Sequence, residues 1–314
     1  MITLNYAWES PCSRPERVAP LQAPGAESNM WLNLVFLLLL ALIIMPTAVL
    51  LLGISRWQAG TTRLQARLEA GRGRIIPNTY DSNELDGLPA PVQRYFLASL
   101  KDGQPIISAA ELGLEGEIDL GRGQGKWSRA TATQSVVMQR PGFHWDARVC
   151  IAPATKIFVL DAYIAGTGIL KAALFGLFPV VKVPSSPELT HAELMRFLAE
   201  APLYPTKLLP SQGVVWEPID DRSARATLAD GDPSVSLVFA FDEAGLIGGV
   251  RASGRYRALD GKMVQTPWEG SFSDYKERSE MRIPVRAEVA WILPEGRTPY
   301  WRGRVTDVMY KFSA

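Results

Sequence analysis

An uninterrupted apolar run near the N-terminus is the strongest pattern in the chain. From Trp31 to Ile54 there is no charged side chain, and Asn33 and Thr47 are the clearly polar ones. As a helix, the run is long enough to cross a hydrocarbon core of about 30 Å, which takes roughly 20 apolar residues. It exceeds the roughly 7–15 apolar residues of a signal-peptide core, and no convincing cleavage site follows it. The pattern therefore predicts one uncleaved transmembrane helix over residues 31–54.

The segments on either side of this run differ in composition. Residues 1–30 are rich in proline and lack an apolar period, which predicts a disordered tail. Met30 directly precedes the run, so a start at Met30 is an alternative in which residues 1–29 are not translated. Residues 55–84 are a basic juxtamembrane segment and linker, and their first part is expected to be a short helix on the membrane surface. Against the single acid Glu69, this segment carries five arginines: Arg56, Arg63, Arg67, Arg72 and Arg74.

Several of these side chains are expected to contact the membrane. Trp31 and Trp57 flank the apolar run at the levels where tryptophan prefers the membrane interface. Arg56, Arg63 and Arg67 are placed to meet lipid head groups. Because the arginines follow the helix, the positive-inside rule favours the C-terminal part on the cytoplasmic side.

Residues 85–314 are dominated by apolar and polar positions that alternate with a period of two. Around residues 143–151, Phe143 and Trp145 share one face, while His144, Asp146 and Arg148 share the other. Turn signals separate many such segments, so we expect a globular, mainly antiparallel β domain over 85–314. The expected strands lie near residues 107–118, 126–138, 143–151, 156–164, 213–219, 223–229, 235–242, 246–257, 264–275, 284–293 and 300–311.

Helices are fewer in this part of the chain. Residues 88–100 have prolines suited to a first helical turn and a shared apolar face. Thr190 and Glu193 have the spacing of a capping box, which predicts a helix running to Ala201. Together the patterns predict the α+β class, mainly antiparallel β, preceded by one transmembrane helix.

A second apolar segment, residues 166–183, is too short and interrupted to span a bilayer. Three interpretations remain open: a buried core helix, an interfacial helix dipping into the same membrane, or a flap over an apolar cavity. If it contacts the membrane, the side chains that do so are expected to be Leu170, Phe175 and Phe178.

Composition and charge exclude several classes of protein. With 47% hydrophobic and 21% charged residues, the chain is neither wholly disordered nor collagen-like. A formal net charge of +1 argues against nucleic-acid binding, which normally needs a basic excess. Since the arginines concentrate beside the apolar run and the β domain is slightly acidic, membrane lipid is the expected partner. No protein partner is indicated.

The sequence assigns no catalytic residue, metal site or cofactor. Two histidines, His144 and His191, and two cysteines, Cys12 and Cys150, provide no zinc-ligand cluster. The glycines of residues 121–125 lie between two expected strands and lack the helix N-terminus that a dinucleotide site needs.

Polar side chains that share strand faces are the candidates for a ligand pocket. His144, Asp146 and Arg148 project to one side, and Asp161 and Tyr163 on the following strand are expected near them. Glu288, Arg302 and Arg304 form a second group near the C-terminus. The alternative is a solvated sheet face with cross-strand ion pairs.

Five motifs carry a resemblance to a family. They are LPAPVQRYF (88–96), PGFHWDAR (141–148), the long segment 187–220, TPWEGSF (266–272) and PYWRGR (299–304). Over residues 85–311 the chain resembles a bacterial family of uncharacterised membrane-anchored proteins, a domain of unknown function. Strand order gives a more distant likeness to lipoprotein carriers. That likeness implies a strongly curved, half-barrel-like sheet that packs against a few helices and encloses a cavity for acyl chains.

The leading hypothesis is a single-pass membrane protein whose β domain binds a lipid-like or other apolar ligand at the membrane surface. The first alternative is a metal-independent enzyme on a membrane-associated substrate, using the acids Asp146, Asp161 and Glu288. The second is a scaffold that binds another protein through an exposed sheet edge.

Overall fold

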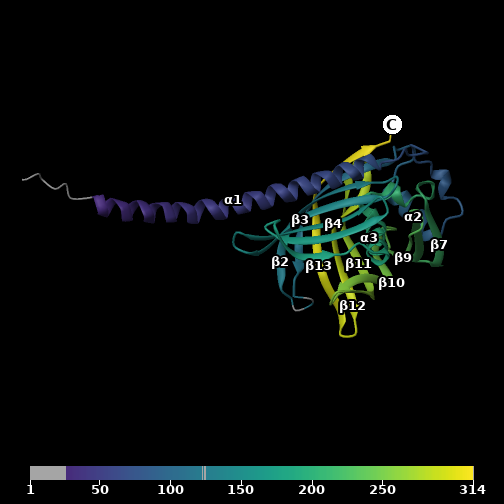
Figure 1. The fold of residues 1–314 in the computed structure, drawn as a ribbon. Coiled ribbons are helices and arrows are strands. Elements are labelled where there is room, and N and C mark those ends of the chain that lie inside the picture. The colour runs from purple at the N-terminus through teal and green to yellow at the C-terminus, as the bar shows by residue number, and fades with distance from the viewer. Residues whose placement is uncertain (1–25, 122, 124, 314) are drawn as a thin grey trace, which may run out of the picture. The chain divides into compact units, whose positions relative to one another are not determined.

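A computed structural model describes residues 26–121, 123 and 125–313 of the chain (Figure 1). Most of the tail that was predicted to be disordered, residues 1–25, lies outside the described residues. The chain divides into two compact units, the first ending at Val49 and the second beginning at Leu50.

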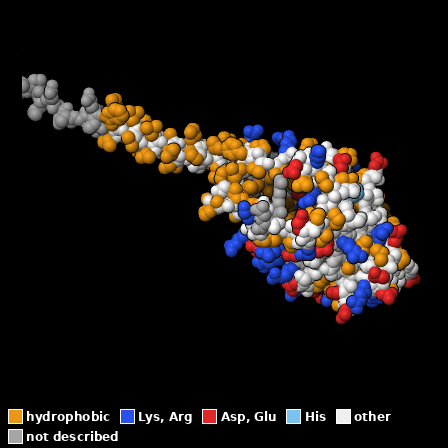
Figure 2. All heavy atoms as spheres, turned by 90° about the horizontal axis from the view of Figure 1, so that it is seen from below, with side chains coloured by type: hydrophobic (Ala, Val, Ile, Leu, Met, Phe, Trp, Pro, Cys, Tyr) orange, Lys and Arg blue, Asp and Glu red, His pale blue; other side chains and the backbone are white. Residues whose placement is uncertain are grey.

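The apolar run forms about half of one long helix, α1 (Ala26–Ala70). From Met30 onward this helix is long and apolar enough to cross a membrane, with a mean hydropathy of 3.0 over its most apolar stretch. Pro46 lies inside the helix, and the next residue, Thr47, donates its hydroxyl hydrogen bond to the carbonyl of Ile43. Figure 2 shows the apolar part of α1 covered by hydrophobic side chains, as a helix surrounded by lipid requires.

The second unit is built on one open, antiparallel sheet of 13 strands. Strands β1–β6 form one meander and β7–β13 another, and the pairing of β1 with β13 joins them. The predicted fold class, mainly antiparallel β with a few helices after one apolar helix, is confirmed. Figure 1 shows the sheet curving around α3. The strands are β1 (Ile107–Asp119), β2 (Trp127–Val137), β3 (Gly142–Ala152), β4 (Thr155–Ile164), β5 (Thr167–Leu174), β6 (Phe178–Val183), β7 (Val214–Asp220), β8 (Ser223–Ala229), β9 (Ser234–Phe241), β10 (Ile247–Leu259), β11 (Lys262–Arg278), β12 (Met281–Leu293) and β13 (Gly296–Phe312).

One helix fills much of the concave side of the sheet. It is α3 (Pro187–Ala199), which lies between the two meanders in the sequence. The helix packs against strands of both, including β4, β5, β9 and β10. Its buried side includes Leu194, Phe197 and Leu198, which join the main hydrophobic core. The remaining helices are α2 (Ala90–Ser99) and the short 3-10 helices η1 (Ser82–Leu85), η2 (Ala201–Leu203), η3 (Pro205–Leu208) and η4 (Pro210–Gln212).

The second apolar segment is a β-hairpin, so the two helical interpretations of it are wrong. Residues 166–183 form β5 and β6, and β6 is an edge of the sheet. The hairpin turn uses Phe175 and Gly176, both with positive φ. Short apolar runs fit a buried helix and a strand equally well, so the pattern alone did not distinguish them. Phe178 and Val180 remain 53% and 56% exposed.

The last five turns of α1 lie against the outer face of the sheet, and this corrects two expectations. The basic segment is helical, but its apolar face packs on protein and not on lipid, because Trp57 and Leu68 are buried against β3–β5 and their neighbours. Trp57, expected at the membrane interface, is only 5% exposed and donates its indole hydrogen bond to Asp146 at 2.8 Å. The spacing of Trp57, Thr61, Leu64 and Leu68 is that of one helical face, a signal present in the sequence.

Candidate functional site

A cavity of about 490 Å³ lies between α3 and the concave face of the sheet. Strands β1–β6 and β10–β13 contribute to its wall, because alternate residues of each strand point to this face. Most of the lining is apolar, and it includes Leu114, Val159, Leu170, Val289, Trp291 and Trp301.

The start of α3 is fixed by a close approach to β5. The N-cap is Ser186, whose hydroxyl accepts from the amide of Leu189, so the predicted capping box at Thr190 is wrong. Thr190 instead accepts a hydrogen bond from the amide of Gly168 at 3.1 Å. A Cβ on Gly168 would lie 2.7 Å from the Leu189 carbonyl oxygen, so glycine is required for this contact. Glu193 is thereby free of a capping role and points inward.

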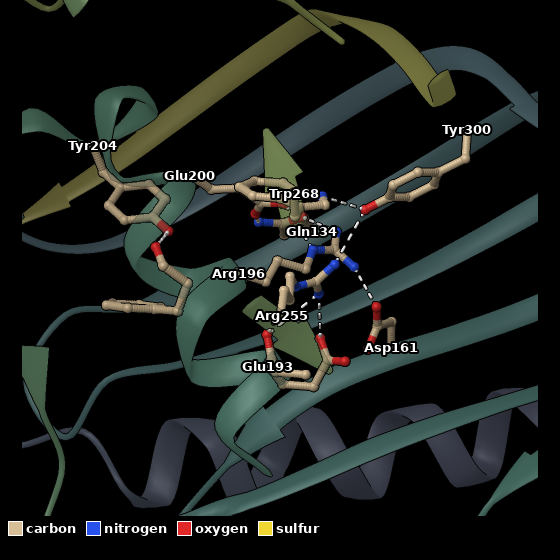
Figure 3. Close-up of polar contacts among 11 residues, drawn as sticks. Gln134, Asp161, Glu193, Arg196, Glu200, Tyr204, Arg255, Trp268 and Tyr300 are labelled. Carbon is tan, nitrogen blue, oxygen red and sulfur yellow. Dashed lines mark hydrogen bonds and ion pairs between the residues drawn. The ribbon is translucent and has the colours of Figure 1, made fainter. Parts of the chain in front are cut away.

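Arg196 on α3 is the centre of the first polar cluster (Figure 3). Its guanidinium contacts Asp161 of β4 at 2.5 Å and Glu200 at 2.7 Å. Glu200 also accepts from the amide of Gln134 on β2 at 2.6 Å. Two carboxylates thus neutralise this largely buried cation, and the aromatic faces of β3 lie 4.8–5.1 Å from it.

Arg255 on β10 is the centre of the second cluster and is only 8% exposed. It donates to the Ala192 carbonyl of α3 at 3.3 Å and to the Tyr300 hydroxyl at 3.1 Å. The Tyr300 hydroxyl also accepts from the indole of Trp268 at 2.9 Å. Both hydrogen-bonding partners of Arg255 are neutral groups, in contrast to those of Arg196.

Glu193 lies between the two arginines and is 3% exposed. Its carboxyl is 3.9 Å from the Arg255 guanidinium. Burial, and next the nearby Asp161 carboxylate, raise the pKa of Glu193 well above its usual value. When protonated, Glu193 can donate to Asp161, and this hydrogen bond would satisfy the Asp161 and Glu193 carboxyl oxygens that otherwise lack partners. Burial and Asp161 therefore favour the protonated form of Glu193 in the site.

The first group of predicted pocket residues is divided between the two faces of the sheet. His144, Asp146 and Arg148 point to the outer face, where Arg148 forms an ion pair with Asp146 under α1. The expectation that Asp161 and Tyr163 lie near them is wrong, because the register pairs Asp161 with Trp145 and Tyr163 with Phe143. Asp161 therefore belongs to the Arg196 cluster on the inner face.

The remaining members of these groups lie elsewhere. Tyr163 is buried and donates to Asp230, and burial raises its pKa. Glu288, Arg302 and Arg304 line a shallow groove in which each is ion-paired. The three acids of the enzyme alternative occupy three different surroundings, and the structure does not bring them together.

The structure adds residues that sequence reasoning missed as site candidates. Arg196, Arg255, Trp268 and Tyr300 belong to the polar part of the cavity, as does Glu193, which was interpreted as a cap. All five lie in the motifs that carry the family resemblance or within eleven residues of one. Among the described residues, no group of histidine, cysteine and acidic side chains is arranged to hold a metal ion.

Residues 86–310 match a family of unknown function, DUF6920, which confirms the family resemblance. No curated protein matches the chain. A LolA superfamily protein from Nitrosomonas europaea is similar in structure. The two sequences are 9% identical, the match covers 79% of this chain and 93% of that chain, and the TM-score is 0.34. A β-barrel-like protein of the domain of unknown function DUF1849 from Brucella abortus is 11% identical to this chain. That match covers 66% of this chain and 99% of the other, with a TM-score of 0.20.

The raised pKa of Glu193 has a measurable effect on stability. Above the ordinary glutamate pKa the unfolded chain releases this proton while the native chain keeps it, so the free energy of unfolding falls as pH rises. We expect Glu193→Gln to remove this contribution, so its melting temperature falls less than that of the parent between about pH 5 and pH 8. The exposed Glu217→Gln is the control. An unchanged pH dependence in Glu193→Gln would contradict a retained proton.

Proposed function

The chain belongs to the family of unknown function DUF6920, and from the geometry of its cavity we propose that its β domain binds a lipid-like or other apolar ligand at the membrane surface. The cavity is the observation that carries this proposal. Its volume of about 490 Å³ falls within the range of roughly 300–1,000 Å³ that is typical of small-molecule pockets. Its apolar wall with a few convergent polar groups is the arrangement that favours an amphiphile.

The membrane is the source of ligand in this proposal. α1 is the candidate anchor, and the exposed arginines Arg56, Arg63 and Arg67 are proposed to meet lipid head groups. Trp31, 68% exposed, is proposed to lie at the membrane interface.

The β5–β6 hairpin connects the cavity with an exposed apolar surface. Leu170 and Val181 line the cavity, and Val181 is also 43% exposed at the sheet edge. Phe178 is exposed beside it, and Phe175 lies in the turn. We propose that this hairpin touches the membrane surface, because the same strands then line the cavity and meet lipid.

Filling the cavity tests the binding proposal. Val289 on β12 lines the cavity, and Val289→Trp is expected to reduce the bound lipid by about tenfold or more, because the indole occupies space that the ligand would fill. The measurement is native mass spectrometry of the full chain purified in mild detergent, with melting temperature as the check on folding. Val215→Trp, at a 62% exposed position on β7, is the matched control. A parent protein free of lipid, or a Val289→Trp protein that retains it equally, would refute the proposal.

We also propose that the β domain lies on the cytoplasmic side, from the arginines that follow the apolar run. Cys150 is exposed on β3 and reports the position of the domain. In a Cys12→Ser variant, a membrane-impermeant maleimide is expected to label Cys150 after permeabilisation and not in intact cells. Labelling in intact cells would place the domain on the opposite side, and the Cys150→Ser variant controls for other reactive groups.

A further inference from the structure

We infer that the ligand of this cavity is a single-chain amphiphile with a monoanionic head group, of which a fatty acid is the simplest, and that Arg255 binds that group. This inference rests on the proposed function and specifies the class of ligand. It starts from the difference between the two buried arginines of the cavity wall.

The two arginines differ in how their charge is balanced. Arg196 contacts the carboxylates of Asp161 and Glu200 at 2.5 and 2.7 Å. Arg255 donates to a backbone carbonyl and a tyrosine hydroxyl, and the carboxyl nearest to it, that of Glu193, is 3.9 Å away. An unbalanced buried cation is costly, so an anion supplied by a ligand would be strongly stabilised there.

The surroundings of Arg255 match a head group next to an acyl chain. The Arg255 guanidinium carbon lies 5.4 and 5.7 Å from the ring centroids of Trp268 and Trp291, so both rings make cation–π contacts with it. Trp291 also lines the cavity beside the apolar Val289 and Leu293. A chain can therefore lie along apolar side chains while its head reaches the guanidinium.

Beside the cavity, Arg255 and Arg257 both make their hydrogen bonds to neutral groups. Glu193 on α3 faces Arg255. The other acids of the cluster, Asp161 and Glu200, are paired with Arg196. Arg257, two residues along β10, adds a second cation that donates to Thr266. A carboxylate forms charge-assisted hydrogen bonds with a guanidinium fork and carries a single charge, so it fits better than a phosphate monoester.

Two photoreactive probes with the same chain test the inference. The full chain is placed in phosphatidylcholine nanodiscs at about pH 8, where a carboxylic acid is ionised. It is then cross-linked with a diazirine fatty acid or with the methyl ester of that acid. We expect the acid to label cavity-lining peptides at a concentration about ten- to a hundredfold lower than the ester. Equal labelling by both would overturn the inference and leave the proposed function standing. Absence of cavity labelling by either would overturn both.

Three variants test whether Arg255 produces the preference for the acid over the ester. Arg255→Met is expected to abolish the difference between acid and ester, Arg255→Lys to keep part of it, and Arg225→Met, on the exposed side of β8, to keep all of it. An undiminished preference for the acid in Arg255→Met would overturn the role of Arg255.

Glu193→Gln tests whether the charge of Arg255 is already balanced. It is expected to leave the preference for the acid unchanged, because Arg255 makes its hydrogen bonds to the Ala192 carbonyl and the Tyr300 hydroxyl while the Glu193 carboxyl lies 3.9 Å away. A tenfold tighter binding of the acid by Glu193→Gln would show that Glu193 is the counter-ion of Arg255. That result would overturn the inference independently of whether Arg255→Met folds.

Discussion

The pairing of β1 with β13 is the constraint on which the rest of this domain depends. It joins two meanders that are otherwise separate sheets and places Ile107 beside Phe312. Within this pair glycine faces glycine, Gly116 opposite Gly303. A Cβ on Gly303 would lie 2.7 Å from the Trp301 ring, so the missing side chain gives this ring room. Trp301 then packs edge-on against Trp145 of the other meander at 5.8 Å.

Joining the meanders confines α3, because this helix connects them in the sequence and is held on the curved inner face. Two arginines attach it to opposite halves of the sheet: Arg196 reaches Asp161 on β4, while Arg255 on β10 reaches back to the Ala192 carbonyl. Buried ionic contacts of this kind set position more than they add stability. The helix is held at a fixed place over the sheet, and the space beside it is the cavity.

Much of the fold could be predicted from the sequence because its signals are local. The alternation around Phe143 and Trp145 identified β3, and the charge-free run identified the apolar part of α1. The hairpin at residues 166–183 was missed because a short apolar run has no unique period. The docking of Trp57 was missed because its indole was interpreted as a membrane-interface group, although its helical spacing with Leu68 was available.

The site was harder to predict because it depends on register and on burial. A one-residue difference in pairing decides whether Asp161 faces Asp146 or Arg196, and alternation within one strand does not contain that information. In the sequence, Arg255 does not differ from other polar positions on strands. Its burial under α3 follows from the curvature of the sheet, which the sequence pattern does not show. The aromatic residues Trp268 and Tyr300 did stand in motifs that carry the family resemblance, although their hydrogen bond could be found only in three dimensions.

The central claim is that the space between α3 and the sheet is a binding site for an amphiphile. The most direct measurement is an experimental density map of the full chain, purified in mild detergent and placed in nanodiscs. We predict elongated density along Val289 and Trp291 that ends at the Arg255 guanidinium. A cavity that contains only water, or one closed by collapsed side chains, would contradict the account.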